Sequence, residues 1–129
     1  MTSSIPLPVR VVQGAYASGA TAQTRGMVRE SGVDSKTVGA QKVWMGLVVF
    51  GPGMRSAAHH HGEAETAVYV LSGRLRIYYG EGYKEKVEGG PGDYLYIPAF
   101  TPHIEENDSA EQVRVIASRS PDNIVVNLE

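Results

Sequence analysis

The sequence predicts an all-β fold, a small sandwich or barrel, from three observations. Its 129 residues include 15 glycines and 7 prolines, which are spread along the chain and separate short apolar runs. The runs are rich in β-branched and aromatic residues, as in AVYVL at 67–71, and signals for helices are poor. One run, RLRIYY at 74–79, alternates arginine with leucine and isoleucine, which is typical of a strand with one buried face.

Turn-forming residues divide the chain into expected strands. Glycine-containing turns are expected at 51–53, 72–73, 80–83 and 89–92. The stretch 31–41 has no clear period and is expected to be a loop, and 15–24 is small and polar, as in a linker or arm. We expect an N-terminal arm over 1–24 and one domain over 25–129. The expected strands are 9–13, 26–30, 42–50, 67–71, 74–79, 84–88, 93–97, 103–107, 111–117 and 123–128.

Composition excludes several classes of function. The chain has no cysteine, which excludes thiol catalysis, disulfides and cysteine-based zinc sites. Its net charge is −2 without a basic run, so a nucleic-acid partner is not expected. The N-terminus shows no secretory signal and no apolar run is long enough for a membrane span, so no membrane partner is expected. These features predict a cytoplasmic, single-domain protein.

The chemistry-bearing stretch is AHHHGEAET at 58–66, which holds three of the four histidines. Residues two apart share a face of a strand, so His59 and His61 point one way and His60 the other. Glu65 has the same parity as His61 in an unbroken strand, and His103 comes from a separate segment. Three imidazoles and one carboxylate would suit a divalent transition metal: Mn, Fe, Ni, Co, Cu or Zn.

The spacing around these residues resembles the two motifs of the cupin superfamily, and in particular an RmlC-like single-domain cupin. Motif one, glycine, His-x-His, glutamate and glycine, is similar to Gly53, His59, His61, Glu65 and Gly73. Motif two is matched at every defined position by Gly92, Pro98, His103 and Asn107. The resemblance implies a small double-stranded β-helix barrel, the cupin jelly roll, with a metal at its centre. It also implies the ligands His59, His61, Glu65 and His103.

The sequence departs from motif one at a single point. Seven residues, not six, separate Glu65 from Gly73. Without a bulge to absorb the difference, parity leaves two interpretations. Either Glu65, Ala67, Tyr69 and Leu71 face inward, or Thr66, Val68 and Val70 do. In the second case three histidines and water would complete the metal shell, and Glu63 is a further candidate carboxylate.

Cupins that resemble this chain include dioxygenases, decarboxylases, isomerases and proteins that only bind ligands, so the fold alone does not decide the function. We expect a metal-binding cupin that acts on or binds a small, oxygen-bearing organic molecule in the barrel. One alternative is a non-enzymatic binding or sensing module. Another is a metal-free, epimerase-like cupin that modifies sugars, with His103 as base. The N-terminal arm and the apolar run VWMGLVVF at 43–50 suggest a homodimer.

Overall fold

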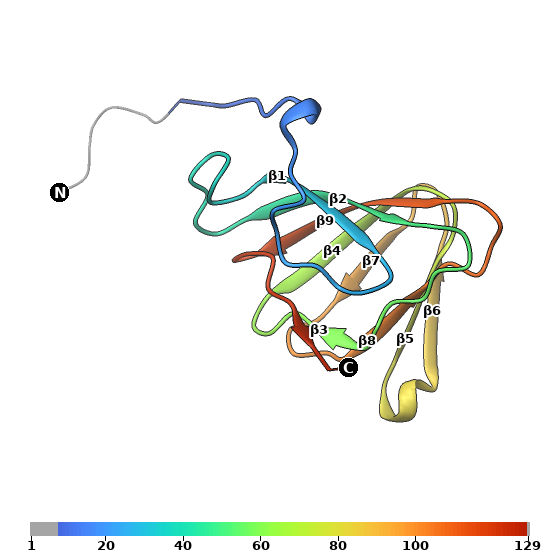
Figure 1. Ribbon diagram of the computed structural model, residues 1–129. Coiled ribbons are helices and arrows are strands. Elements are labelled where there is room, and N and C mark those ends of the chain that lie inside the picture. Colours follow the sequence, from blue (N-terminus) through green and yellow to red (C-terminus); the bar gives the residue numbers. More distant parts are fainter. Residues whose placement is uncertain (1–7, 129) are drawn as a thin grey trace.

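Two antiparallel sheets of five strands face each other in the computed structural model, which describes residues 8–128 (Figure 1). The first sheet has the order β1 (Val28–Val33), β2 (Trp44–Phe50), β9 (Val113–Ser120), β4 (Glu65–Ser72) and β7 (Tyr94–Ile97). The second has the order β10 (Val126–Asn127), β3 (His59–His60), β8 (His103–Glu106), β5 (Leu75–Tyr79) and β6 (Glu85–Gly89). Two short 3-10 turns, η1 (Gly14–Tyr16) and η2 (Glu81–Tyr83), complete the elements. The predicted all-β jelly roll is confirmed.

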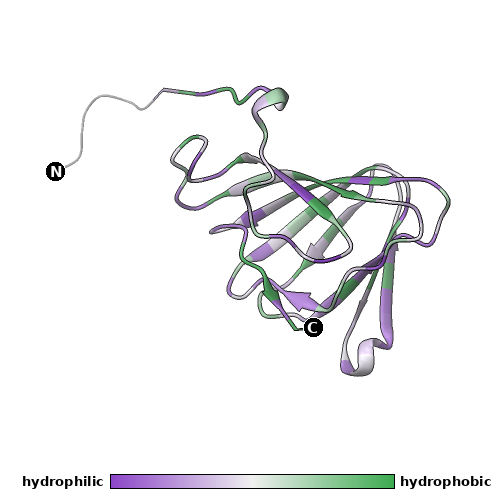
Figure 2. Ribbon diagram, viewed as in Figure 1, coloured by the Kyte–Doolittle hydropathy of each residue, from purple (hydrophilic) through white to green (hydrophobic). Residues whose placement is uncertain are grey.

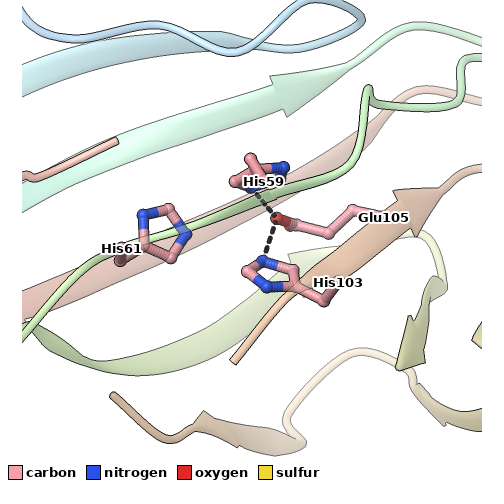
Figure 3. A group of neighbouring side chains, drawn as sticks. All are labelled: His59, His61, His103 and Glu105. Carbon is pink, nitrogen blue, oxygen red and sulfur yellow. Dashed lines mark hydrogen bonds and ion pairs between the residues drawn. The ribbon is translucent and has the colours of Figure 1, made fainter. Parts of the chain in front are cut away.

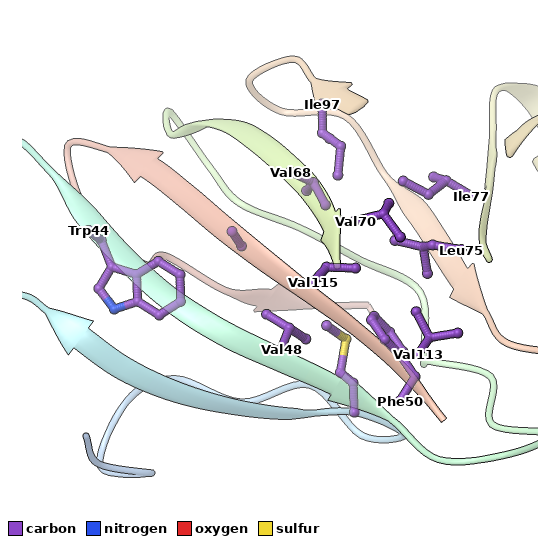
Figure 4. Packing of buried hydrophobic residues seen from close by; sticks show 12 residues of the cluster. Trp44, Val48, Phe50, Val68, Val70, Leu75, Ile77, Ile97, Val113 and Val115 are labelled. Atoms are coloured by element: carbon purple, nitrogen blue, oxygen red, sulfur yellow. The ribbon is translucent and has the colours of Figure 1, made fainter. Parts of the chain in front are cut away.

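The hydrophobic core lies between the sheets and follows from the alternation of side chains along each strand. On β4, Thr66, Val68 and Val70 are buried, and their neighbours Glu65 and Ala67 are exposed. Figure 2 shows hydrophobic and hydrophilic residues interleaved along the strands of both sheets. The buried cluster drawn in Figure 4 consists of Met27, Trp44, Val48, Phe50, Val68, Val70, Leu75, Ile77, Ile97, Val113, Val115 and Ala117.

Most expected strands are present, but the one expected at 123–128 is reduced to Val126–Asn127, and the other exceptions lie near the N-terminus. Residues 9–13 form no strand and are mostly exposed, and residues 1–7 of the expected arm lie outside the described part of the chain. β1 continues to Val33, into a stretch that the sequence indicated as loop, because it pairs with β2 and is bridged from Ser18 to Ser31. The division at residue 25 stays a prediction. Within residues 8–128, no helix has the length and apolar character needed to cross a membrane.

The short strand β3 places the histidine run opposite His103. His59 pairs with His103 of β8 on one side, and His60 pairs with Val126 of β10 on the other. Gly62, two residues later, has a φ of 56°, in the left-handed region that favours glycine, and turns the chain away. The pairing of β3 with β8 therefore places His59 directly beside His103.

Asn107, at the end of β8, ties the two sheets together from a fully buried position. Its amide nitrogen donates to the carbonyl oxygens of Phe50 at 3.3 Å, Gly51 at 3.0 Å and Glu111 at 2.7 Å. Its oxygen accepts from the backbone nitrogen of Ser109 at 3.1 Å. The motif asparagine therefore has a structural role, because it closes the turn between β8 and β9.

Candidate metal site

Four side chains converge between the sheets: His59, His61, His103 and Glu105 (Figure 3). One ligand atom from each lies within 4.8 Å of the others, and each residue is 3 % exposed or less. His59 comes from β3, His61 from the turn after it, and His103 and Glu105 from β8. The three histidines that the sequence singled out as ligands are therefore brought together.

The three imidazole rings share one hydrogen-bonding arrangement, in which Nδ1 faces a backbone carbonyl oxygen. These are the oxygens of Ala57 for His59 at 2.8 Å, Ile124 for His61 at 2.7 Å and Thr101 for His103 at 2.9 Å. A carbonyl oxygen can only accept, so Nδ1 must carry the proton. In a neutral ring, Nε2 is then left with a free lone pair, as in histidines that bind metals.

The Nε2 atoms of His59 and His103 lie beside a carboxylate. Oε1 of Glu105 is 3.2 Å from Nε2 of His103 and 3.3 Å from Nε2 of His59. Nε2 of His59 is buried and has no hydrogen-bond partner among residues 8–128. Several acceptors that face one another in a buried site need a positive charge between them, from a proton or a cation. The donor set of three imidazole nitrogens and one carboxylate oxygen fits a divalent transition metal.

Burial and neighbouring charges set the protonation states of the site. Burial, followed by the charge of Arg119, lowers the pKa of His61 to about 2, so its imidazole is neutral at physiological pH. Burial alone would raise the pKa of Glu105. The contacts with His103 and His59 lower it by more, so the pKa lies well below its usual value and the carboxyl is ionised. Metal ligands need these two forms, a neutral imidazole and a carboxylate.

Glu65 is not part of the cluster, and the expectation that it would converge with the histidines is wrong. Its side chain lies on the exposed face of β4, where the phenol of Tyr96 donates a hydrogen bond to it. The physical reason is strand parity: Thr66 occupies the inward position, as in the second interpretation of the register. The other candidate, Glu63, is also exposed.

Sequence reasoning missed Glu105, although a signal for it exists. Glu105 follows His103 by two residues on the same strand, so both must point to the same side. This is the argument that pairs His59 with His61, applied to the second motif. The backbone nitrogen of Glu105 also donates to Oγ of Ser56 at 2.9 Å.

His60, on the opposite side of β3, accepts a hydrogen bond from the backbone nitrogen of Gly62 and takes no part in the cluster.

Arg119 was also missed, and it borders the site from the opposite sheet. Its Nη2 lies 3.2 Å from Nε2 of His61, its Nε donates to Oγ1 of Thr66 at 2.9 Å, and its Nη1 donates to Oδ1 of Asn123 at 3.0 Å. The side chain is buried and packs over the ring of Trp44. Because Nδ1 of His61 carries the ring proton, Arg119 is the donor in this contact.

A cavity of about 250 Å³ reaches the cluster at His103. Its walls come from β5, β6, β7 and the segment that leads into β8. The lining is mostly apolar, with hydroxyl groups on two tyrosines and one threonine. The lining residues are Ile77, Tyr79, Val87, Tyr96, Ile97, Pro98, Thr101 and His103. Such a cavity suits a mostly apolar molecule with a few polar atoms.

A comparison with known protein families identifies the family of this chain. A family model described as "Cupin domain" matches residues 46–119, which include all four cluster residues. This chain belongs to the cupin family. The cupin is also 36% identical over 86 residues to a polyketide synthase, CurC, from Streptomyces cyaneus. That alignment covers 66% of the cupin and 53% of CurC, so it spans about half of the relative's length.

Solved structures of similar shape share its fold. The polyketide cyclase RemF from Streptomyces resistomycificus superposes with a TM-score of 0.75 at 19% identity, over 95% of the cupin and 87% of RemF. The oxalate decarboxylase OxdC from Bacillus subtilis superposes with a TM-score of 0.69 at 23% identity, over 84% of the cupin and 29% of OxdC. At these identities the likeness is one of fold.

Proposed function

We propose that this cupin binds a divalent transition metal through His59, His61, His103 and Glu105, and acts beside it on a small organic molecule bearing carbonyl oxygens. The observation that carries the proposal is that the three buried histidines and Glu105 bring one ligand atom each within 4.8 Å of one another, with each Nδ1 facing a carbonyl oxygen. A metal in such a site polarises a carbonyl oxygen and so makes the neighbouring C–H bonds more acidic.

The cavity limits the class of substrate. Ile77, Val87, Ile97 and Pro98 present apolar surface to whatever approaches His103. A small dicarboxylate dianion would lose its hydration there and gain little from these walls. A longer molecule that is mostly carbon, with ketone oxygens at intervals, would bury apolar surface and place one oxygen near the cluster. This favours a polyketone over oxalate.

The names of the similar proteins agree with that choice, since CurC is called a polyketide synthase and RemF a polyketide cyclase. We therefore propose cyclisation of a poly-β-ketone as the reaction. A proton leaves a CH₂ group between two carbonyls, and that carbon forms a bond to a distant carbonyl carbon of the same chain. This carbon–carbon bond closes the ring. The new alkoxide takes up a proton, and loss of water followed by enolisation of the remaining ketones makes the ring aromatic. No oxidant or reductant is needed.

The residues around the cavity would serve this reaction by holding and shielding the substrate. The apolar walls exclude water, which strengthens electrostatic interactions near the cluster. Tyr79 and Thr101 both line the cavity. The phenol of Tyr79 can donate a hydrogen bond to a ketone oxygen, whereas the hydroxyl of Thr101 already donates to the carbonyl oxygen of Ala99 at 3.1 Å. Tyr79 is the strand partner of His103, so its position relative to the cluster is fixed by the sheet.

The experiment for this proposal offers short poly-β-ketone thioesters to the metal-loaded protein and follows the products by mass spectrometry. The expected product has lost water relative to the substrate and absorbs as an aromatic ring. His103→Ala should abolish product formation, and Lys86→Ala, at an exposed position of β6, should leave it unchanged. Product formation at the same rate without metal would contradict the proposal.

One observation favours a second candidate, a binding module without turnover. Apart from His103 and the two tyrosines, the cavity lining carries no titratable group that could move a proton. Such a module would bind the same polyketones but release them unchanged. Isothermal titration that shows binding, together with an absence of product, would select this candidate.

We further propose that the cupin is a homodimer. The outward face of the first sheet exposes apolar side chains, among them Val28, Met45, Leu71 and Tyr94. A second copy would cover such a surface. Sedimentation that gives the mass of a monomer at micromolar concentration would contradict this.

A further inference from the structure

Arg119 is a buried cation whose hydrogen bonds all go to neutral groups. Its partners are the hydroxyl of Thr66, the amide oxygen of Asn123 and the imidazole of His61. None of the ion pairs in the described part of the chain includes it. A buried guanidinium without a carboxylate partner is costly to maintain, which indicates a use other than stability.

The contact with His61 occupies the atom that a metal would need. Nδ1 of His61 carries the ring proton because it faces the carbonyl oxygen of Ile124 at 2.7 Å. Nε2 therefore has a single lone pair, and Nη2 of Arg119 lies 3.2 Å from it. A lone pair can accept a hydrogen bond or bind a metal, but it cannot do both. Binding of a metal by His61 must displace the guanidinium.

The charges around the site also oppose the binding of a metal ion. Arg29, fully buried on β1, donates to the carbonyl oxygen of Ala22 and the hydroxyl of Thr24. Glu105 is the only acidic residue that the described part of the chain contributes to the cluster. Two buried guanidinium groups against one carboxylate already leave an excess of positive charge, and a divalent ion adds two more. An anion entering the site would offset this repulsion.

We propose that Arg119 competes with the metal for Nε2 of His61 and that an anionic ligand relieves the competition. Metal affinity and affinity for organic oxyanions, such as a carboxylate or an enolate, are then coupled, and each ligand tightens the binding of the other. The inference rests on the proposed metal site. It adds a positioning residue, and it predicts that the enolate form of a polyketone binds beside the metal more tightly than the neutral ketone does.

The test measures zinc affinity by competition with a chromophoric chelator, with and without acetate, and with neutral acetamide in its place. The proteins are wild type, Arg119→Met and the control Arg114→Met, whose arginine is on the outward face of β9. Arg119→Met should bind zinc about tenfold more tightly without acetate, because a hydrogen bond and a repulsive charge are removed. Acetate, corrected for its own zinc complex, should tighten zinc binding severalfold in wild type and Arg114→Met, and much less in Arg119→Met. Acetamide should have no such effect.

The outcomes separate this inference from the metal site itself. Equal zinc affinity in wild type and Arg119→Met, with the same response to acetate, overturns the inference and leaves the metal site intact. Absence of zinc binding in all three proteins overturns both.

If Arg119→Met does not fold, nitrogen NMR of the wild type replaces it. The Nε2 signal of His61 should show an accepted hydrogen bond before zinc is added, and the guanidinium protons of Arg119 should shift when zinc binds. Guanidinium signals that zinc leaves unchanged overturn the inference.

Discussion

Glu105 and His103 lie two residues apart on β8, and Oε1 of the glutamate is 3.2 Å from Nε2 of the histidine. The alternation of the strand sends both side chains between the sheets, where His59 and His61 meet them. Glu65, on β4, points outward to Tyr96. The two glutamates thus form a natural pair for a comparison of inward and outward carboxylates.

Glu105→Gln should lower the affinity for a divalent metal by about 100-fold or more, because a neutral amide replaces an ionised ligand. Glu65→Gln, at the exposed position, should leave the affinity within about twofold. Calorimetric titration with Zn²⁺ measures both. A loss of affinity in Glu65→Gln of the same size as in Glu105→Gln would show that the register of β4 differs from the one described.

The stability of the metal-free protein should fall as the pH falls from 7 to 5. The pKa of His61 is lowered to about 2 in the folded state, from about 6.5 in the unfolded chain. The unfolded state therefore binds a proton that the folded state does not, and stability present above pH 6.5 is lost as the pH falls. At pH 5 the loss from this residue is about 2 kcal/mol. Urea unfolding of wild type and His61→Gln checks this; parallel pH profiles would contradict it.

Asn107→Ala should destabilise the protein by about 3 kcal/mol, because it leaves buried carbonyl oxygens without donors. The matched control, Asn127→Ala on the exposed strand β10, should change the free energy of unfolding by about 0.5 kcal/mol or less. Urea denaturation gives both values. Similar values for the two variants would mean that the amide of Asn107 does not join the sheets.

Val87→Trp should narrow the cavity, because Val87 lines it and is partly exposed at its edge. Metal content should stay at the wild-type value, while binding of a polyketone should weaken about tenfold, since a large side chain takes the place of ligand volume. Lys86→Trp, at the neighbouring exposed position of β6 and on the other face of that strand, serves as the control. Unchanged ligand binding in Val87→Trp would place the ligand elsewhere.

The sequence predicted most of the strands, because alternation and glycine turns are local signals. It also predicted that His59, His61 and His103 would meet, since parity and the second motif carry that information. The orientation of Glu65 could not be predicted, because two registers of β4 satisfied the pattern and only pairing with β9 decides between them. The inward orientation of Glu105 could have been predicted, because it lies two residues after His103 on the same strand.

Arg119 could not be found from the sequence. An arginine on a strand usually points to solvent, and nothing local distinguishes Arg119 from Arg114 five residues earlier. Its inward position depends on the parity of β9, and its partners Thr66 and His61 are 53 and 58 residues away. Contacts of this range are set by the packing of the sheets.

The most direct test of the metal site is the stoichiometry of metal in the purified protein, measured by elemental analysis after loading with Co²⁺ and removal of the excess, for wild type and for His59→Ala. We predict about one ion per chain in the wild type, with visible absorption from cobalt bound to imidazole nitrogen, and its loss in His59→Ala. A wild-type protein that retains no metal, or a His59→Ala variant that retains as much as the wild type, would contradict the assignment of this cluster as a metal site.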